Sequence, residues 1–434
     1  MHILYMHQHF QTRHGFTGNR SFEFSKQLIA RGHQVTMICS GIDNEPRLSV
    51  PAGKKYFVTE ISGIQVVPIA AANANPLKIT RMSGYRRMLQ FLHFARLATT
   101  VGKKLARPDV VFASHTPLTI GLAGRDLAGH FRVPFVFEVR DLWPQALINI
   151  GVLRNPLVIA WLRRMERRIY RAADHIVALS PGMKAGIVAT GIPSERVTVI
   201  PNASDLDLFR PDLDRRPGRD RLRLGDRFAA IYFGGMGVAN GLDYVLDAAR
   251  VLQRRGEQRV VLVLHGHGGC RSELEAQAAR DQLTNVVFSD PVPDKGLVAQ
   301  CVAACDVCLT IYRASKEHTW SPNKMFDALA AGRPVLINVP GWLRETIESN
   351  DCGRGVSPED PCELADALQQ LVDDPATCQR WGHNARALAE REFAREKLAG
   401  QLEQVLKRAV EGAAGALHER RRANDAMGRN RNES

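Results

Sequence analysis

Two series of strand-like segments, each alternating with helix-like segments, constrain the fold of this chain more than any other feature. The first series of apolar runs lies at residues 2–6, 34–39, 109–114, 133–139, 175–179 and 196–201. The second series lies at residues 229–234, 259–266, 285–290, 306–312 and 334–339. Continuous apolar strands that alternate with helices indicate a parallel sheet covered on both faces. The sequence therefore predicts an α/β protein with two doubly wound, Rossmann-like domains in tandem.

The composition between and beyond the two series sets the expected domain boundaries. A charged, proline-containing stretch at 209–228 interrupts the alternation. The end of the chain is charged and lacks apolar periodicity, which is typical of a disordered tail. The expected parts are an N-terminal domain at 1–205, a linker at 206–228, a C-terminal domain at 229–385, helices at 386–417 that pack back toward the N-terminal domain, and a disordered tail at 418–434.

Basic residues are concentrated in one segment of the first half. The net charge of +13 indicates an acidic partner, namely nucleic acid, anionic lipid or a phosphorylated substrate. The segment 74–107 contains eight basic residues, no acidic residue and interleaved apolar residues. This pattern favours contact with an anionic membrane surface, and the alternative is a solvated helix on a basic protein. No run of 18 apolar residues occurs and the N-terminus does not resemble a signal peptide, so we expect a cytoplasmic protein, peripheral on the inner face of the cell membrane.

The cysteines and acidic residues do not form a pattern typical of a metal site. Cys301, Cys305 and Cys308 share one segment with valine, alanine and leucine, which favours buried, reduced thiols. Asp-Leu-Asp occurs at 205–207 and 212–214, and we interpret both copies as chance because of where they lie. No histidine or cysteine cluster has ligand spacing, so the sequence predicts neither a metal nor a cofactor.

The stretch 318–336, HTWSPNKMFDALAAGRPVL, carries the clearest chemical signal. Ser321 fits the capping position of a helix, a proline follows it, and from Asn323 onward the first turn offers free backbone N–H groups. Such a helix start attracts anions, and Lys324 adds a point charge. Asp327 follows one turn later, where a carboxylate can accept hydrogen bonds from hydroxyl groups. Phosphate at the helix start and hydroxyls one turn along describe a nucleoside diphosphate, whereas the plain alternative is an ordinary capped helix.

Glycine-containing loops follow two strands of the second half. Glycine permits close approach of the backbone to a phosphate, although the same glycines are also common in ordinary turns. The candidate donor-side residues in these loops are Gly234, Gly235, Asn240, His265 and Gly266.

Polar residues follow three strands of the first half, at the edge of the sheet where ligands bind. These loops are expected to converge, and the alternative is that each polar side chain is structural. The candidate residues are Gly15, Gly18, Arg20 and Arg140 in acceptor-side loops, with His115 and Asp141 as candidate catalytic groups.

The motifs of both halves resemble the family-4 retaining glycosyltransferases of the GT-B fold. The resemblance rests on SPNKMFDALAAGRPVL at 321–336, PNASDLDLF at 201–209 and ERRIYRAADHIVALS at 166–180, and it extends over residues 1–410. In that family a helix of the second domain starts at the donor diphosphate and carries an acidic residue that binds ribose, and Asp327 takes its place here. FEVRDLWP, YFGGMGVANGL and SPNKMFDALAAG also look like the WbuB-type transferases of polysaccharide and O-antigen assembly.

The chain departs from the commoner family pattern at several positions. The arginine and lysine that generally follow the first strand of the second domain are replaced here by Gly235 and Asn240. An acidic residue of the family is replaced by Thr319, and its histidine–aspartate pair by Arg140–Asp141. These departures match the WbuB-type branch.

The resemblance implies a reaction and a set of roles. Two Rossmann-like domains would face each other across a cleft and transfer a sugar, such as an N-acetylated amino sugar, from UDP or a similar nucleoside diphosphate to a hydroxyl of a lipid-linked saccharide. The anomeric configuration would be retained, and the helix start with Lys324 would stabilise the leaving group without a metal. His115 would orient the sugar, and Asp141 would lie near the acceptor hydroxyl.

Two other functions are compatible with parts of the sequence. A nucleotide-sugar epimerase on the same fold would bind the same donor without an acceptor. A nucleic-acid-binding protein would account for the positive charge, but the chain has no nucleic-acid recognition motif, so we expect no nucleic-acid partner.

Overall fold

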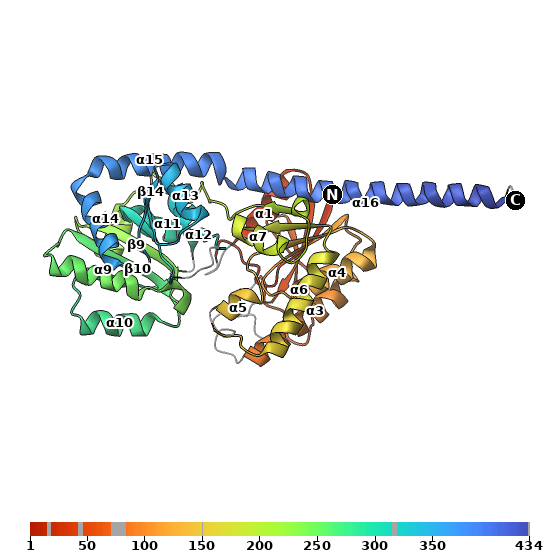
Figure 1. Cartoon of the computed structure of the whole chain (residues 1–434), viewed down its shortest axis with the longest axis horizontal. Coiled ribbons are helices and arrows are strands. Elements are labelled where there is room, and N and C mark those ends of the chain that lie inside the picture. Colours follow the sequence, from red (N-terminus) through yellow and green to blue (C-terminus); the bar gives the residue numbers. More distant parts are fainter. Residues whose placement is uncertain are drawn as a thin grey trace. The chain divides into compact units, whose positions relative to one another are not determined.

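The computed structural model of the chain describes residues 1–14, 19–41, 47–70, 84–149, 151–292, 294–314 and 319–432, and for residues 416–432 the backbone only (Figure 1). The chain divides into two compact units. The first unit contains Met1–Phe10, Ser21–Ile200 and Ala399–Ser434, and the second contains Gln11–Arg20 and Pro201–Leu398. The predicted boundary after residue 205 differs from this division by a few residues.

An eight-stranded sheet forms the centre of the first unit, in the order β3-β4-β2-β1-β5-β6-β7-β8. Its strands are β1 (His2–Met6), β2 (Gln34–Ser40), β3 (Thr59–Ile61), β4 (Ile64–Ile69), β5 (Val110–Ser114), β6 (Phe135–Val139), β7 (His175–Ala178) and β8 (Val197–Val199). All pairs are parallel except β3 with β4. The central strands β5 and β6 are buried at every residue, as expected for strands covered on both faces. The six strands predicted for this half are confirmed.

Helices cover the first sheet and connect its parallel strands (Figure 1). They are α1 (Arg20–Ala30), α3 (Gly84–Gly102), α4 (Ile120–Phe131), α5 (Gln145–Asn149), α6 (Pro156–Ala172) and α7 (Pro181–Val188). Helix α6 shows how local sequence sets a boundary, because the side chain of its N-cap Asn155 accepts hydrogen bonds from the Leu157 and Val158 amides. Residues 74–83 of the predicted membrane segment 74–107 lie outside the described residues, and α3 contains much of the remainder.

A six-stranded parallel sheet forms the centre of the second unit, in the order β11-β10-β9-β12-β13-β14. Its strands are β9 (Phe228–Gly235), β10 (Val260–His267), β11 (Val286–Ser289), β12 (Val307–Thr310), β13 (Val335–Ile337) and β14 (Gly353–Gly355). The five strands predicted for this half are confirmed, and β14 was not predicted. Apolar clusters lie on both faces of this sheet, so the unit is doubly wound as the alternation of strands and helices indicates.

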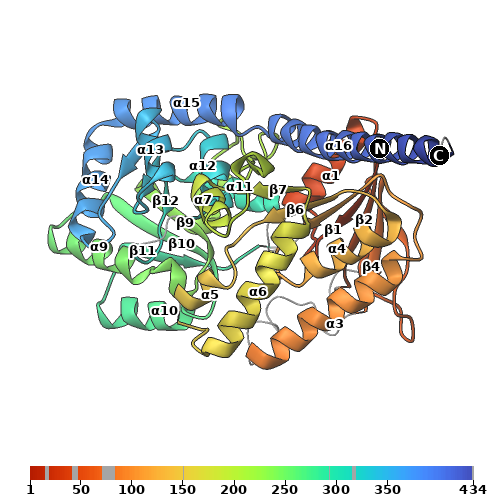
Figure 2. The same ribbon diagram turned by 45° about the vertical axis from the view of Figure 1, so that its right-hand side comes forward.

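The helices of the second unit lie on both faces of its sheet (Figure 2). They are α8 (Arg216–Leu222), α9 (Asp243–Arg254), α10 (Arg271–Arg280), α11 (Lys295–Ala304), α12 (Asn323–Ala330), α13 (Trp342–Ser349), α14 (Pro361–Asp373) and α15 (Pro375–Glu392). Residues 206–228, predicted as a linker, are instead part of this unit. Phe209, Leu222 and Leu224 belong to its core, because the apolar positions of this charged stretch pack inward together with α8.

Helix α16 (Arg395–Asn432) continues through residues that the sequence predicts as a disordered tail. Arginine, a good helix former, occurs five times in residues 418–434, so this composition is compatible with a helix even though it lacks apolar periodicity. Leu402 and Leu406 near the start of α16 are buried, and Glu403 forms a salt bridge with His33 of the first unit at 3.0 Å. The residues of α16 from Ala399 onward belong to that unit.

All eight cysteines are free, and Cys301, Cys305 and Cys308 are buried in the core of the second unit, as predicted. Burial raises the pKa of the Cys308 thiol to about 12. In the part of the chain that the structure describes, no helix is both long enough and apolar enough to cross a membrane.

Candidate active site

The predicted glycine turn of the second unit lies where β9 and β10 end side by side. Gly234 pairs with Gly266 across these parallel strands. A Cβ atom added to Gly266 would lie 2.0 Å from the Gly234 carbonyl oxygen, and both glycines have positive φ angles, +133° and +146°. Glycine is therefore required for this close backbone approach. Gly234 and Gly235 are exposed, so the turn presents bare backbone to solvent.

Two further contacts fix the shape of this turn. The Tyr232 hydroxyl donates a hydrogen bond to the Gly235 carbonyl oxygen at 2.6 Å. The side-chain oxygen of Asn240 accepts a hydrogen bond from the Gly237 amide at 3.0 Å. The Asn240 side chain thus stabilises the turn by a hydrogen bond to its backbone, and the predicted contact of Asn240 with the donor stays a prediction.

Lys324 lies against the same turn, as the two separate motifs would require for a shared site. Its Cε atom is 3.6 Å from the position of a Cβ added to Gly234. Its ammonium group lies over the rings of Tyr232 and Tyr312, 3.8 Å and 5.1 Å from their centroids. Burial lowers the pKa of Lys324 to about 7. Among the described residues, no carboxylate lies within ion-pair distance of Lys324.

The start of α12 differs from the prediction in one respect. Ser321 does not cap the helix: its hydroxyl accepts a hydrogen bond from the Asn202 amide at 3.0 Å, and its carbonyl oxygen accepts one from the Asn202 side chain at 2.5 Å. Pro322 is the N-cap and Asn323, which is partly exposed, is the first helical residue. Among the described residues no side chain caps α12. The Met325 amide donates to the Pro322 carbonyl oxygen at 3.2 Å, so the amides of Asn323 and Lys324 are the first-turn N–H groups left for an anion.

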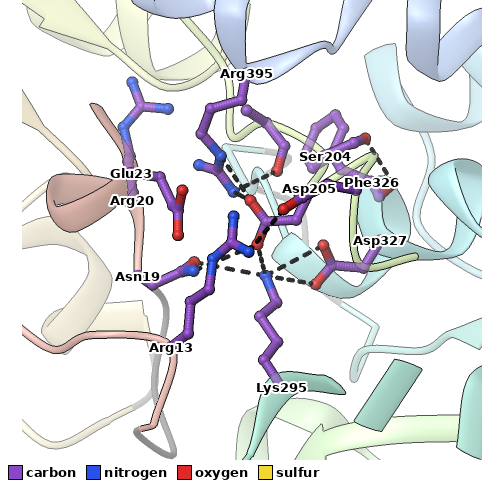
Figure 3. Close-up of polar contacts among 12 residues, drawn as sticks. Arg13, Asn19, Arg20, Glu23, Ser204, Asp205, Lys295, Phe326, Asp327 and Arg395 are labelled. Carbon is purple, nitrogen blue, oxygen red and sulfur yellow. Dashed lines mark hydrogen bonds and ion pairs between the residues drawn. The ribbon is translucent and has the colours of Figure 1, made fainter. Parts of the chain in front are cut away.

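Asp327 points into a buried ionic network of the second unit (Figure 3). Lys295, the first residue of α11, lies 3.4 Å from the Asp327 carboxylate and also forms an ion pair with Asp205. Burial raises the pKa of Asp327 to about 6, although Lys295 opposes this shift. The carboxylate is thus shared with the network, and the predicted contact between Asp327 and ribose stays a prediction.

His265 lies at the end of β10, next to Gly266. Its Nδ1 atom is 3.0 Å from the Ser289 hydroxyl oxygen. Burial, together with the smaller effects of Arg221 and Arg271, lowers the pKa of His265 to about 4. The ring is therefore neutral near pH 7, and a base or phosphate contact by this residue stays a prediction.

Histidines, an arginine and a tryptophan meet at the strand ends of the first unit. His115 follows β5 and is 1% exposed. Its ring packs against Trp143 and Phe137, with ring centroids 5.6 Å and 6.5 Å away. Neither ring nitrogen has a hydrogen-bond partner among the described residues. Burial, together with the smaller effects of Arg140 and His9, lowers the pKa of His115 to about 3, so this histidine is neutral near pH 7.

Arg140 joins this group through a histidine that the sequence analysis missed. Arg140 donates a hydrogen bond to Nε2 of His7 at 3.1 Å. Nδ1 of His7 lies 2.7 Å from the Ser21 hydroxyl oxygen, and because Nε2 accepts, the neutral ring carries its proton on Nδ1. Asp141 is exposed beside this group. The loops after β1, β5 and β6 therefore converge as expected, and the HQHF run after β1 was the signal for His7.

Two sets of predicted acceptor-side residues have other outcomes. Arg20 is 1% exposed and donates a hydrogen bond to the Pro201 carbonyl oxygen at 2.5 Å, so it is a buried structural residue and not a loop contact. Gly15 and Gly18 lie outside the described residues. In the described ranges, no group of three or more histidine, cysteine, aspartate or glutamate residues could hold a metal ion.

The comparisons with known proteins agree with this geometry. Residues 17–203 match a family described as a glycosyl transferase 4-like domain, and residues 227–374 match glycosyl transferases group 1. The chain is 30% identical over 410 residues to a D-inositol 3-phosphate glycosyltransferase of Nocardioides sp., covering 89% of this chain and 84% of the relative. It is 26% identical over 264 residues to the D-rhamnosyltransferase WbpZ of Pseudomonas aeruginosa, covering 59% and 67%.

Solved structures show the same architecture. Sucrose-phosphate synthase from Thermosynechococcus elongatus has a TM-score of 0.74 at 19% identity, covering 95% of this chain and 99% of that chain. HepE of Anabaena, solved with UDP, has a TM-score of 0.67 at 17% identity, covering 94% and 100%. The fold is GT-B, with two parallel-sheet α/β units and a helical C-terminal segment. The chain belongs to the glycosyltransferases that combine a glycosyl transferase 4-like domain with a group 1 domain.

Proposed function

We propose that this glycosyltransferase moves a sugar from a nucleoside diphosphate donor to a hydroxyl of a lipid-linked saccharide in bacterial surface polysaccharide assembly. UDP is the proposed nucleotide, which is supported by HepE, solved with UDP and with UDP-glucose. An N-acetylated amino sugar is the proposed group transferred, on the basis of the WbuB-type motifs. The solved glycosyltransferase WaaG, which is involved in lipopolysaccharide biosynthesis, supports a polysaccharide role.

The observation that carries this proposal is the position of Lys324 beside the glycine turn. A departing nucleoside diphosphate concentrates negative charge on its phosphate oxygens. The open N–H groups at the start of α12 and the ammonium of Lys324 supply donors and positive charge at one place. Lys324 thus compensates for the cations that Gly235 and Asn240 replace. Because the chain itself supplies this charge, we propose a metal-independent reaction.

The proposed reaction retains the anomeric configuration. The bond between the anomeric carbon and the diphosphate oxygen breaks, and the electron pair leaves with the diphosphate. The acceptor hydroxyl attacks from the same face, and its proton passes to a departing phosphate oxygen. The neutral, buried ring of His115 would orient the sugar through its unpaired nitrogen atoms, and Asp141 would hold the acceptor hydroxyl.

A membrane surface is proposed as the place where the lipid-linked acceptor is met. Leu157 and Trp161 on α6 are 79% and 45% exposed, although both are apolar. Arginines exposed on the same helix follow them, namely Arg163, Arg164, Arg167 and Arg168. Helix α3, with exposed Tyr85 and Leu89, lies beside α6 in both views (Figures 1 and 2). Apolar side chains next to arginines suit the interface of an anionic bilayer.

The proposed reaction can be tested with the purified chain, a panel of nucleotide sugars and a saccharide acceptor. Lys324→Ala should lower kcat by about 100-fold or more, as for the loss of one preorganised donor at a developing charge. Lys54→Ala is the matched control, because it removes an exposed lysine of the first unit, and it should retain the wild-type rate. The rate should not change when EDTA is added, and NMR of the product should show the anomeric configuration of the donor. An unchanged rate for Lys324→Ala would remove the leaving-group assignment, and an inverted product would remove retention.

A further inference from the structure

Lys324 is held in an unusual way for a partly buried lysine. Its ammonium lies over the faces of Tyr232 and Tyr312, and in the part of the chain described here it forms no ion pair. Lys295, in the same unit, has the opposite environment, because it forms ion pairs with the carboxylates of Asp205 and Asp327. The charge of Lys295 is therefore neutralised inside the protein, whereas that of Lys324 is not.

The two tyrosine rings are fixed by the strands that carry them. Tyr232 lies in β9, its ring is buried, and its hydroxyl is bound to the Gly235 carbonyl oxygen. Tyr312 follows β12, and Asn338 holds its backbone by accepting from the Tyr312 amide at 2.9 Å and donating to its carbonyl oxygen at 2.8 Å. Because β9 and β12 are neighbours in the sheet, the rings lie close to each other and to the start of α12.

A tryptophan stacks on the second ring. Trp320 stacks on Tyr312 with ring centroids 4.1 Å apart and an angle of 24° between the rings. The Trp320 carbonyl oxygen accepts a hydrogen bond from the Trp342 indole at 3.1 Å, which anchors the residue next to α13. The stack limits the movement of the Tyr312 ring, so the place of the ammonium over it is defined.

An aromatic face attracts a cation without neutralising its charge. A carboxylate in the same place would hold Lys324 equally well, but it would also repel an incoming diphosphate. Two ring faces can fix the ammonium and leave its full positive charge for an anion that enters from the side of Gly234.

We propose that Tyr232 and Tyr312 are positioning residues that hold the Lys324 ammonium beside the glycine turn with its charge available to the departing diphosphate. This inference rests on the proposed function, since it assigns partners to the lysine that acts there. Neither tyrosine is expected to touch the reacting atoms.

The test separates the ring from the hydroxyl at each position. Phenylalanine keeps the ring face, and leucine removes it, so Tyr312→Phe, Tyr312→Leu, Tyr232→Phe and Tyr232→Leu are compared for kcat and donor KM across pH. We expect each leucine variant to lower kcat about tenfold with a smaller change in KM, the upper range for loss of a cation–π contact. The phenylalanine variant at position 312 should retain the wild-type kcat within about twofold.

The pH dependence of the transfer rate distinguishes the proposed role of the tyrosines from a purely structural role, which would leave this dependence unchanged. Transfer should fall as pH rises through the pKa of Lys324, because the neutral amine cannot stabilise the leaving group. Among the residues that the structure describes, the titratable groups that face the ammonium are Tyr232 from β9 and Tyr312 after β12, and burial lowers the pKa of Lys324. Removing a ring should move the alkaline fall in transfer rate to lower pH by roughly half a unit, because the protonated form of Lys324 loses stabilisation and its pKa decreases.

Controls separate failure of this inference from failure of the proposed function. Tyr244→Leu removes a buried tyrosine of α9 whose hydroxyl bonds the Ser357 carbonyl oxygen at 2.8 Å, and it should lower Tm without moving the alkaline fall in transfer rate. If Tyr232→Leu does not fold, Tyr312→Leu, whose ring is only half-buried, carries the test. If the leucine variants keep the wild-type kcat and the wild-type alkaline pH profile while Lys324→Ala is inactive, this inference alone is overturned. A fully active Lys324→Ala would overturn the proposed function as well.

Discussion

Gly266 is the residue that leaves least freedom at the candidate donor site. A Cβ there would lie 2.0 Å from a backbone oxygen of β9, which no side-chain movement can relieve. The exposed backbone of Gly234 and Gly235 depends on that approach, so a change at Gly266 acts on the binding surface through the backbone.

Gly266→Ala should therefore destabilise the fold and abolish donor binding together. The positive φ angle and the clash predict a loss of about 2 kcal/mol or more in the free energy of unfolding, because the strand ends must separate. Gly269→Ala, in the same loop but with nothing within 4 Å of the added Cβ, is the matched control. Chemical denaturation and thermal shift with UDP measure both effects. Wild-type stability and donor binding in Gly266→Ala would contradict the geometry of this turn.

The buried His115 predicts a pH dependence of stability. Its folded pKa is about 3, below the ordinary histidine value of 6.5, so the unfolded chain binds the proton more tightly. The stability that the chain gains by burying neutral His115 is fully present above about pH 6.5, and it is lost progressively as the pH falls toward 3. Unfolding curves of His115→Phe should show a smaller loss across this range than those of wild type. The exposed His93→Phe is the control, and equal losses in all three proteins would contradict the prediction.

From the sequence, some site residues could be predicted to lie close together, and others could not. Lys324 and Gly234 could be predicted as partners because both follow strands of one parallel sheet, whose carboxyl ends meet at one edge. Ser321 could not be placed, because its partner Asn202 is 119 residues away in the chain and replaces the capping interaction. Arg20 was misread for the same reason, since only the fold reveals that it is buried against Pro201. The rings beneath Lys324 looked like ordinary apolar residues of strand ends.

At the scale of elements, the buried network around Asp205 connects several segments of the second unit (Figure 3). Arg395, the first residue of α16, binds the Asp205 carboxylate through two nitrogen atoms, with Nε at 2.7 Å. Lys295 from α11 also pairs with it, and the Asn19 side chain donates to it at 3.3 Å. Burial alone would raise the pKa of Asp205, but Arg395 and Lys295 outweigh it and hold the pKa below its usual range. The motif interpreted as chance in the sequence therefore has a structural role.

Removing the charge of Arg395 alone should lower the free energy of unfolding more than removing the charges of both Arg395 and Asp205. Arg395→Met leaves a buried carboxylate with less compensation and should lower the free energy of unfolding by about 3–5 kcal/mol. Adding Asp205→Asn to that variant should recover part of the loss, because the uncompensated charge is gone. A double-mutant cycle from urea denaturation measures the coupling. Strictly additive losses would show that Asp205 and Arg395 do not act as a pair.

Regular elements were predictable where burial is continuous, and they were missed where it is not. The strands β1 and β9 are apolar runs that the sequence identifies directly. The β3–β4 hairpin was not predicted, although Ser62 and Gly63 form its turn with positive φ angles of 52° and 78°. Strand β3 has only three residues, and β4 contains the exposed Gln65 and a proline, Pro68, so neither strand has the long apolar run that marked the others.

For the whole molecule, part of the net charge of +13 comes from exposed arginines on helix α6. The exposed arginines of α6 lie next to exposed apolar residues of the same helix, so charge and hydrophobicity act on one surface. Such a surface favours the proposed membrane attachment over general solvation, because attachment needs both positive charge and exposed apolar residues.

Vesicle co-sedimentation should show binding that requires anionic lipid. Wild type should bind vesicles of phosphatidylcholine with phosphatidylglycerol and not pure phosphatidylcholine, and added salt should weaken the binding. The double variant Leu157→Ser with Trp161→Ser should reduce the bound fraction about tenfold or more, because two exposed apolar anchors are lost. Val238→Ser removes an apolar residue of the second unit that is 67% exposed and should bind like wild type. Equal binding to both kinds of vesicle would contradict the membrane proposal.

The central claim is that the start of α12 and the glycine turn of β9 form one site for a nucleoside diphosphate. A crystal structure of the chain with UDP tests it most directly. The account predicts the diphosphate within hydrogen-bonding distance of the Lys324 ammonium and the first-turn N–H groups of α12, next to Gly234. UDP bound elsewhere on the chain, with Lys324 still lying over its two tyrosine rings and in contact with no phosphate, would contradict the account.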